Sequence, residues 1–250
     1  MKKGFVSAAT LVFLLALAPA YAQTTDFFEL VRNGTPQSVQ AAISQGADVK
    51  PRDVNGTTPL HFAAQYNHNP EVITVLVKAG ADLNARDING CTPLLIALEN
   101  TELLPEAIMA LVKAGADAKV TSIEAPLVSA LGNKYSPEVI MALLKAGADA
   151  KVTSIEAPLV SALGNKYSPE VIAALLQAGA NVNAKNPNGA TPLMYATNGD
   201  NPEAMIRAFL KAGADAKAKD SDGKTAFDYA QTNEKLKGTD AYRQLQQASQ

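Results

Sequence analysis

The feature that most constrains the fold is a unit of 32 to 34 residues that recurs along the chain. In the copy at residues 55–87, an Asn-Gly turn precedes Thr58-Pro59. This pair is typical of a helix start, because Thr can cap the first turn and Pro needs no amide partner there. Gly80 is placed to end a second helix in the left-handed conformation. The unit therefore predicts a turn followed by two short helices.

Three positions recur in nearly every copy: a proline that starts the first helix, an alanine within that helix, and a glycine after the second helix. Two short helices cannot bury their own apolar faces, so each unit needs neighbours on both sides. The alanine predicts close contact between stacked first helices. The prolines are Pro59, Pro93, Pro126, Pro158 and Pro192; the alanines are Ala63, Ala97, Ala130, Ala162, Ala196 and Ala230; the glycines are Gly46, Gly80, Gly115, Gly147, Gly179 and Gly213.

The stretch TPLHFAA at residues 58–64, followed by GADLNARD at 80–87, resembles the ankyrin repeat. A phased pair of motifs at a near-constant period makes the resemblance specific. It implies an all-α repeat solenoid, an ankyrin stack of about seven helix-turn-helix units with short β-hairpin fingers. It also implies that His61 bonds locally to Thr58, and that a protein partner binds the finger tips and the exposed ends of the first helices.

The N-terminus predicts an exported protein. Lys2-Lys3, an apolar run over residues 5–18 and Ala20-Tyr21-Ala22 fit a signal peptide at residues 1–22, cleaved after Ala22. Its short, Lys-started form is typical of bacteria, so we expect a periplasmic or secreted protein with no membrane insertion after cleavage. The repeat domain then spans 23–250, with an N-terminal cap repeat at 24–53, internal repeats at 54–87, 88–120, 121–152, 153–186 and 187–220, and a C-terminal cap repeat at 221–250.

The fourth and fifth repeats are unusual, because residues 113–140 and 145–172 are identical at all 28 positions. A recent tandem duplication is sufficient to explain this, and selection for two copies of one site is the alternative. Both repeats lack the Asn-Gly turn and carry Val-Thr-Ser-Ile-Glu instead. We expect their fingers to be shorter and less polar than the others.

No combination of residues indicates catalysis, a cofactor or a metal. His61 and His68 are the only histidines, and Cys91, the only cysteine, excludes an intramolecular disulfide. Without Lys2 and Lys3 the chain has 20 basic and 24 acidic residues, a net charge near −4. This balance argues against a nucleic-acid surface. We therefore expect a non-enzyme whose partner is a protein.

Candidate partner-binding residues lie at the finger tips, the exposed ends of the first helices and the inter-helix loops. Tyr66, Ile88, Ile123 and Ile155 stand out, because apolar or aromatic side chains at exposed tips tend to be binding anchors. Cys91 is either a small surface residue or a redox-sensitive contact. The full set is Val54, Asn55, Thr57, Gln65, Tyr66, Ile88, Asn89, Cys91, Ile123, Tyr135, Ile155, Tyr167, Asn188 and Lys224.

The sequence as a whole predicts a monomeric, non-catalytic protein-protein interaction scaffold of the bacterial periplasm. An inhibitor or immunity-type protein that caps a specific toxin or enzyme is the alternative. The inhibitor would have one tight partner, whereas a general scaffold would have several weaker ones.

Overall fold

The structure, a computed structural model, describes residues 27–100, 105–119, 125–152, 157–199 and 201–250. Within these ranges the regular structure is helical and there is no strand. No helix of the described ranges is long and apolar enough to cross a membrane. The predicted signal peptide lies outside the described residues. The chain divides into two compact units, Met1–Ala116 and Asp117–Gln250, each a stack of helix pairs.

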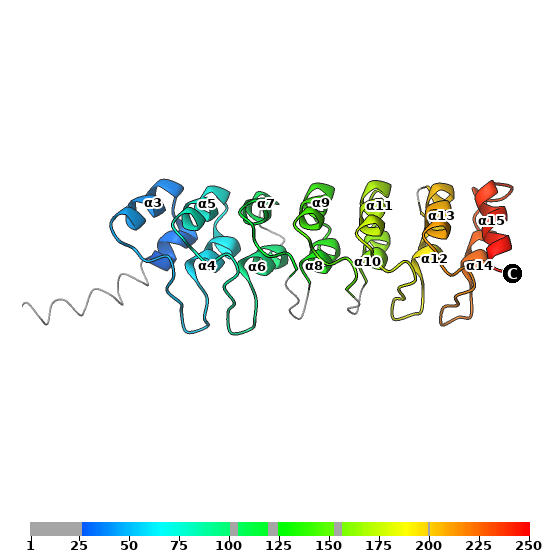
Figure 1. Cartoon of the computed structure of the whole chain (residues 1–250), viewed down its shortest axis with the longest axis horizontal. Coiled ribbons are helices and arrows are strands. Elements are labelled where there is room, and N and C mark those ends of the chain that lie inside the picture. The colour runs from blue at the N-terminus through cyan, green and yellow to red at the C-terminus, as the bar shows by residue number, and fades with distance from the viewer. Residues whose placement is uncertain (1–26, 101–104, 120–124, 153–156, 200) are drawn as a thin grey trace, which may run out of the picture. The chain divides into compact units, whose positions relative to one another are not determined.

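In the first unit the helices lie in two rows (Figure 1). One row holds the first helices of the repeats, with α4 packed against α6. The other row holds the second helices, with α5 packed between α3 and α7. The elements are a helical turn at 27–33, α3 (Pro36–Ser44), α4 (Pro59–Tyr66), α5 (Pro70–Lys78), α6 (Pro93–Glu99) and α7 (Pro105–Lys113).

The second unit repeats the same two-row plan (Figure 1). In its row of first helices, α10 packs between α8 and α12, and α12 contacts α14. In the other row, α9 packs on α11 and α13 on α15. The elements are α8 (Pro126–Gly132), α9 (Pro137–Lys145), α10 (Pro158–Gly164), α11 (Pro169–Gln177), α12 (Pro192–Ala196), α13 (Pro202–Lys211), α14 (Ala226–Gln231) and α15 (Asp240–Ala248).

Every helix from α3 to α13 begins with a proline, as the sequence predicts for the first helices. The residue before the proline supplies the cap in several of them. Thr35 accepts from the Ser38 amide at 3.2 Å, and Asn69 accepts from the Glu71 amide at 2.9 Å. Because proline has no N–H and its φ is already helical, it fits the position where an amide would have no intrahelical partner.

The second helices end where the recurring glycine predicts. These six glycines have φ between 86° and 100°, a region that side-chain-bearing residues rarely adopt. After α5, the Ala81 amide closes the turn on the Leu76 carbonyl at 3.0 Å. The fourth and fifth repeats, which share their identical sequence, are called the twin repeats below. They differ from the other repeats at the ends of their first helices, where Lys134 and Lys166 occupy the left-handed region with φ of 59°.

The recurring alanine is buried in all six repeats, with an exposed fraction of 1% or less. This confirms that the first helices approach closely there. Larger apolar side chains fill the space between the two rows. In the first unit, Val72, Ile73 and Leu76 of α5 are fully buried, whereas Val75 is half-buried.

The four fingers within the described residues are single turns rather than pairs of β-strands. In the first, the Asp53 amide donates to the Thr57 carbonyl and the Gly56 amide donates to the Asp53 carbonyl, both at 3.0 Å. The turns at 87–91, 186–190 and 220–224 repeat this pattern. Five residues are too few to extend the hydrogen bonding into a ladder of strands. The predicted β-hairpins are therefore reduced to their turns.

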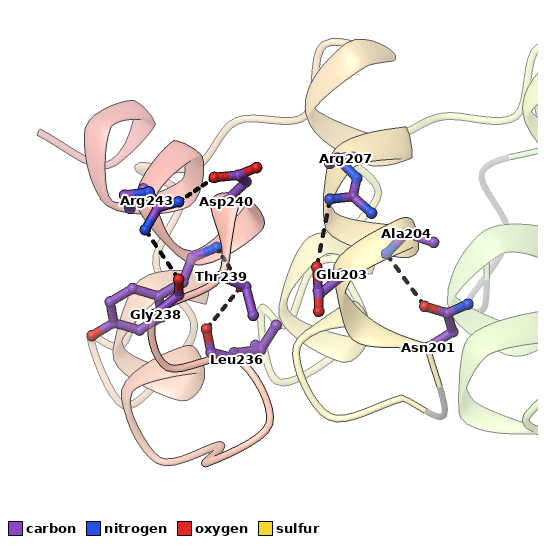
Figure 2. A network of polar contacts seen from close by, with 10 residues as sticks. Asn201, Glu203, Ala204, Arg207, Leu236, Gly238, Thr239, Asp240 and Arg243 are labelled. Atoms are coloured by element: carbon purple, nitrogen blue, oxygen red, sulfur yellow. Dashed lines mark hydrogen bonds and ion pairs between the residues drawn. The ribbon is translucent and has the colours of Figure 1, made fainter.

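Figure 2 shows a network of polar contacts that includes residues of the C-terminal repeat. Thr239 caps α15 by accepting from the Tyr242 amide at 3.2 Å. Arg243 pairs with Asp240 and donates to the Gly238 carbonyl at 3.0 Å. Arg243 and Asp240 are exposed, so this ion pair contributes more to solubility than to stability.

Candidate functional site

The finger tips of the first unit carry two exposed apolar side chains. Val54 is 91% exposed and Ile88 is 69% exposed, at equivalent places on neighbouring fingers. The Ile88 amide donates to the Asn55 carbonyl at 2.9 Å, so the two tips are bonded to each other. Asn55 and Asn89 are exposed beside them. This geometry presents an apolar pair on a hydrogen-bonded support.

Two arginines that are not among the predicted candidates directly precede these fingers and hydrogen-bond to their backbone. Arg52 donates through one guanidinium nitrogen to the Gly56 carbonyl at 2.8 Å and to the Arg86 carbonyl at 2.7 Å. Arg86 in turn donates to the Gly90 carbonyl at 3.2 Å. The signal in the sequence is a basic residue just before each Asn-Gly or Asp-Gly finger. Lys185 acts similarly in the second unit, donating to the Lys219 carbonyl at 3.2 Å.

Tyr66 closes a short aromatic cluster at the end of α4. The ring centroids of Phe28 and Phe62 are 4.9 Å apart, and those of Phe62 and Tyr66 are 5.7 Å apart. The Arg32 guanidinium lies 4.5 Å from the centre of the Tyr66 ring. Tyr66 is 38% exposed. Neighbouring Gln65 is half-buried, and its carbonyl accepts from the Asn100 side chain at 2.5 Å. Tyr66 is thus a partly covered aromatic rather than a free tip.

His61 has the structural role that the resemblance implied. Its Nδ1 lies 2.8 Å from Thr58 Oγ1 and 3.2 Å from the Thr58 amide, which can only donate. Nδ1 is therefore an acceptor, so Nε2 carries the proton and donates to the Cys91 carbonyl at 3.1 Å. Burial lowers the pKa of this imidazole. The histidine links one repeat to the base of the next finger.

Cys91 lies half-buried at that finger base, as does Thr57 at the equivalent position of the preceding finger. Burial, and then the Asp87 carboxylate, raise the pKa of its thiol. A protonated thiol is a poor nucleophile, so this environment favours the small-residue interpretation over the redox-sensitive one.

The two loop tyrosines of the twin repeats, Tyr135 and Tyr167, form a hydrogen bond between these repeats. Tyr135 is only 8% exposed, so the exposure on which its candidacy rested is absent. Tyr167 is half-buried and donates its hydroxyl to the Tyr135 carbonyl at 2.8 Å. Burial raises the pKa of the Tyr167 hydroxyl to about 12. Ile123 and Ile155, the other candidates from these repeats, lie outside the described residues.

A groove of about 1000 Å³ opens in the second unit between the fingers and the inter-helix loops. The loop after α10 lines one side through Tyr167, and the first helices line the other through Met194, Tyr195 and Tyr229. Candidate Asn188 lines the groove from its finger. Candidate Lys224 is exposed on the next finger, with its Nζ 5.6 Å from the centre of the Tyr229 ring.

Two tyrosines of the groove are held by the fingers with opposite hydrogen-bond directions. The Asn186 side chain donates to the Tyr195 hydroxyl at 3.0 Å, so the proton of that hydroxyl stays available. The Tyr229 hydroxyl donates to Asp220 at 2.5 Å, so its oxygen remains an acceptor. The Asp220 hydrogen bond raises the pKa of Tyr229 to about 12. The groove therefore offers both a donor and an acceptor from adjacent repeats.

Within the described residues, no group of three or more His, Cys, Asp or Glu side chains is arranged to hold a metal ion. The structure also brings together the apolar finger tips of the first unit and the tyrosine-lined groove of the second.

Comparisons with known proteins agree with the architecture. A model of ankyrin repeats in three copies matches residues 27–122, and one of ankyrin repeats in many copies matches residues 175–230. The crystal structure of the ankyrin repeat domain of Bcl-3, a unique member of the IkappaB protein family, is similar with 28% identity and a TM-score of 0.62, over 87% of this chain and 97% of that one. The human ASB11 ankyrin repeat domain has 23% identity and a TM-score of 0.60, over 89% and 96%. No curated protein gives a match.

Proposed function

We propose that this chain, which belongs to the ankyrin repeat family, is a non-catalytic scaffold that binds a protein partner through the finger tips of its first unit. Ankyrin repeat domains generally act in protein–protein interaction, and the fold is typically non-catalytic. The proposal adds the surface that makes the contact.

The observation that carries it is the pair Val54 and Ile88. Both side chains are exposed to solvent, where apolar groups add no stability to the isolated domain. Both lie on finger tips that are joined by the Ile88–Asn55 hydrogen bond. Arg52 donates to the Gly56 carbonyl of one finger and to the Arg86 carbonyl next to the other. A surface that is already ordered loses little conformational entropy when it binds. Among the described fingers of the second unit, the equivalent tip positions carry Pro187 and Ser221 instead.

We propose that the partner is met in the periplasm, after export and cleavage at Ala22. Lys2-Lys3, the apolar run and the Ala20-Tyr21-Ala22 site support this. Mass spectrometry of the native protein should find an N-terminus at Gln23. An intact Met1 in a cytoplasmic fraction would contradict it.

The test of the finger surface is a double variant, Val54→Asp with Ile88→Asp. It should fold like the wild type, because both positions are exposed, and it should lose the partner that the wild type captures from its own periplasm. Thr74→Asp with Gln40→Asp adds the same charge at exposed positions of α5 and α3 and serves as the control. Equal capture by both variants would exclude the finger tips. One tight partner would favour the inhibitor or immunity-type function, and several weak partners would favour a general scaffold.

A further inference from the structure

Most junctions between successive repeats contain a side-chain amide that reaches back to the first helix of the preceding repeat. Asn67 donates to the Val31 carbonyl at 2.7 Å, and Asn100 donates to the Gln65 carbonyl at 2.5 Å. Asn165 donates to Leu131 at 3.0 Å and Asn233 to Thr197 at 2.7 Å. We call these bonds the inter-repeat amide ties. Each satisfies a carbonyl at the end of a helix, where no intrahelical partner exists.

The tie between the fifth and sixth repeats is missing. Asn198 is the asparagine of that loop, but its side chain is exposed and makes no hydrogen bond within the part of the chain that the structure describes. Its place in the sequence explains this. Asn198 follows the recurring Ala196 by two residues, whereas Asn165 follows Ala162 by three. Helix α12 is correspondingly short, and Thr197 turns its hydroxyl back to the Met194 carbonyl at 2.7 Å.

The carbonyl that this tie would reach belongs to Leu163, and the twin repeat shows what it lacks. The Leu131 carbonyl accepts from the backbone amides of Asn133 and Lys134, the latter at 3.3 Å, and from the Asn165 side chain. The Leu163 carbonyl, in identical sequence, accepts from the backbone amides of Asn165 and Lys166, the latter at 3.1 Å, and no side-chain donor reaches it among the described residues. It therefore lacks the side-chain donor that its counterpart has.

The groove of the second unit opens at this same junction. Leu163 and Gly164 line it from the end of α10, and Asn198 and Gly199 line it from the loop after α12. The Tyr195 ring packs against Ala157, Val160 and Ala184 of the preceding repeat and presents its free hydroxyl proton. The missing tie and the groove are thus two aspects of one opening between repeats.

We propose that an extended segment of the protein partner binds across this groove and completes the junction through its backbone. A peptide carries one N–H donor and one C=O acceptor per residue, which matches the missing amide donor at the Leu163 carbonyl and the free side-chain amide of Asn198. The group that closes the other junctions is an amide, and the peptide bond is the amide that a protein supplies. One apolar side chain of the segment packs among Tyr167, Met194 and Tyr195. This inference rests on the proposed function and adds a second contact surface to it.

The identical repeats supply a matched pair of variants. Gly132 and Gly164 end α8 and α10, and a Cβ built at either position has no atom within 4 Å. Gly164→Leu places a side chain in the groove, whereas Gly132→Leu adds the same side chain at a junction where the tie is intact. Both should fold equally well. Asn198→Ala removes the free amide without removing a bond.

The probe is a phage library of random linear heptapeptides selected on the whole chain, followed by fluorescence polarisation with a labelled selected peptide. Gly164→Leu should raise the Kd at least tenfold and Asn198→Ala several-fold, whereas Gly132→Leu should leave it within twofold. Unchanged binding to Gly164→Leu would overturn the inference. If that binding is lost instead in Val54→Asp/Ile88→Asp, the finger surface stands and only the groove is wrong. A library that yields no binder also overturns it, and binding of an N-acetylglucosamine tetramer that Gly164→Leu abolishes would assign the groove to a glycan.

Discussion

The side-chain amide of Asn165 donates to the Leu131 carbonyl across 3.0 Å, a hydrogen bond that links the fifth repeat to the fourth. Tyr167 adds a second link two residues later, through its hydroxyl and the Tyr135 carbonyl. Links of this kind make a stack cooperative, because each repeat contacts only its neighbours. The same type of residue at Asn198 makes no such link, so the two asparagines should respond differently to mutation.

Asn165→Ala should destabilise the second unit by about 1 kcal/mol, because the Leu131 carbonyl loses a partner in a partly buried site. Asn198→Ala should change stability by less than about 0.5 kcal/mol, as for an exposed side chain. Urea denaturation followed by circular dichroism measures both. Equal losses in the two variants would mean that Asn198 has a structural bond in solution.

Ala63→Leu should cost about 1–3 kcal/mol, because the larger side chain has no room between the closely stacked helices α4 and α6. Ala41→Leu, at an exposed position of α3, is the control and should be nearly neutral. An unchanged urea midpoint for Ala63→Leu would show that α4 and α6 can separate at little cost.

Lys134→Gly should stabilise the protein by about 1 kcal/mol, because an L-residue in the left-handed region is strained and glycine is not. Lys134→Ala keeps a Cβ and should give no such gain, which separates backbone strain from the loss of the lysine charge. Thermal unfolding of the three proteins decides the matter. A stabilised Ala variant would attribute the effect to charge.

The stability of the first unit should decrease as the pH is lowered, because of His61. Burial lowers its folded pKa below the ordinary value of 6.5. The neutral ring therefore contributes in full above pH 6.5, and the contribution is lost as the pH falls from there through the folded pKa. Denaturation midpoints at about pH 7.5 and 5.5 should differ more for the wild type than for His61→Leu, which carries the side chain found at Leu95 in the next repeat. An equal difference would assign the pH dependence to other groups.

Local rules account for most of what the sequence could predict. The Thr-Pro helix starts, the left-handed glycines and the buried alanines each depend on a few neighbouring residues and on the repeat period. The Thr58–His61 bond is also local. The fingers were predicted as β-hairpins, but five residues support only a turn.

The remaining error and the omission concern contacts between repeats. Tyr135 was predicted to be a surface candidate because it lies in a loop, yet its side chain is buried at the repeat junction. The groove was missed because it lies at a junction where one inter-repeat bond is absent. Its signal was the single-residue difference in spacing between Ala196–Asn198 and Ala162–Asn165. Such a difference has meaning only once the role of Asn165 is known.

Gly132 and Gly164 occupy the same place in identical sequence, and of the two it is Gly164 that lines the groove of the second unit. What differs is the repeat that follows: a second copy after α8, and the unlike repeat at 187–220 after α10. The groove therefore depends on the junction between two unlike repeats and not on the sequence of one repeat alone. Unequal recombination between the copies can add or remove 32-residue segments upstream of that junction. The number of copies can thus drift between lineages while the junction, and any specificity it carries, passes on unchanged.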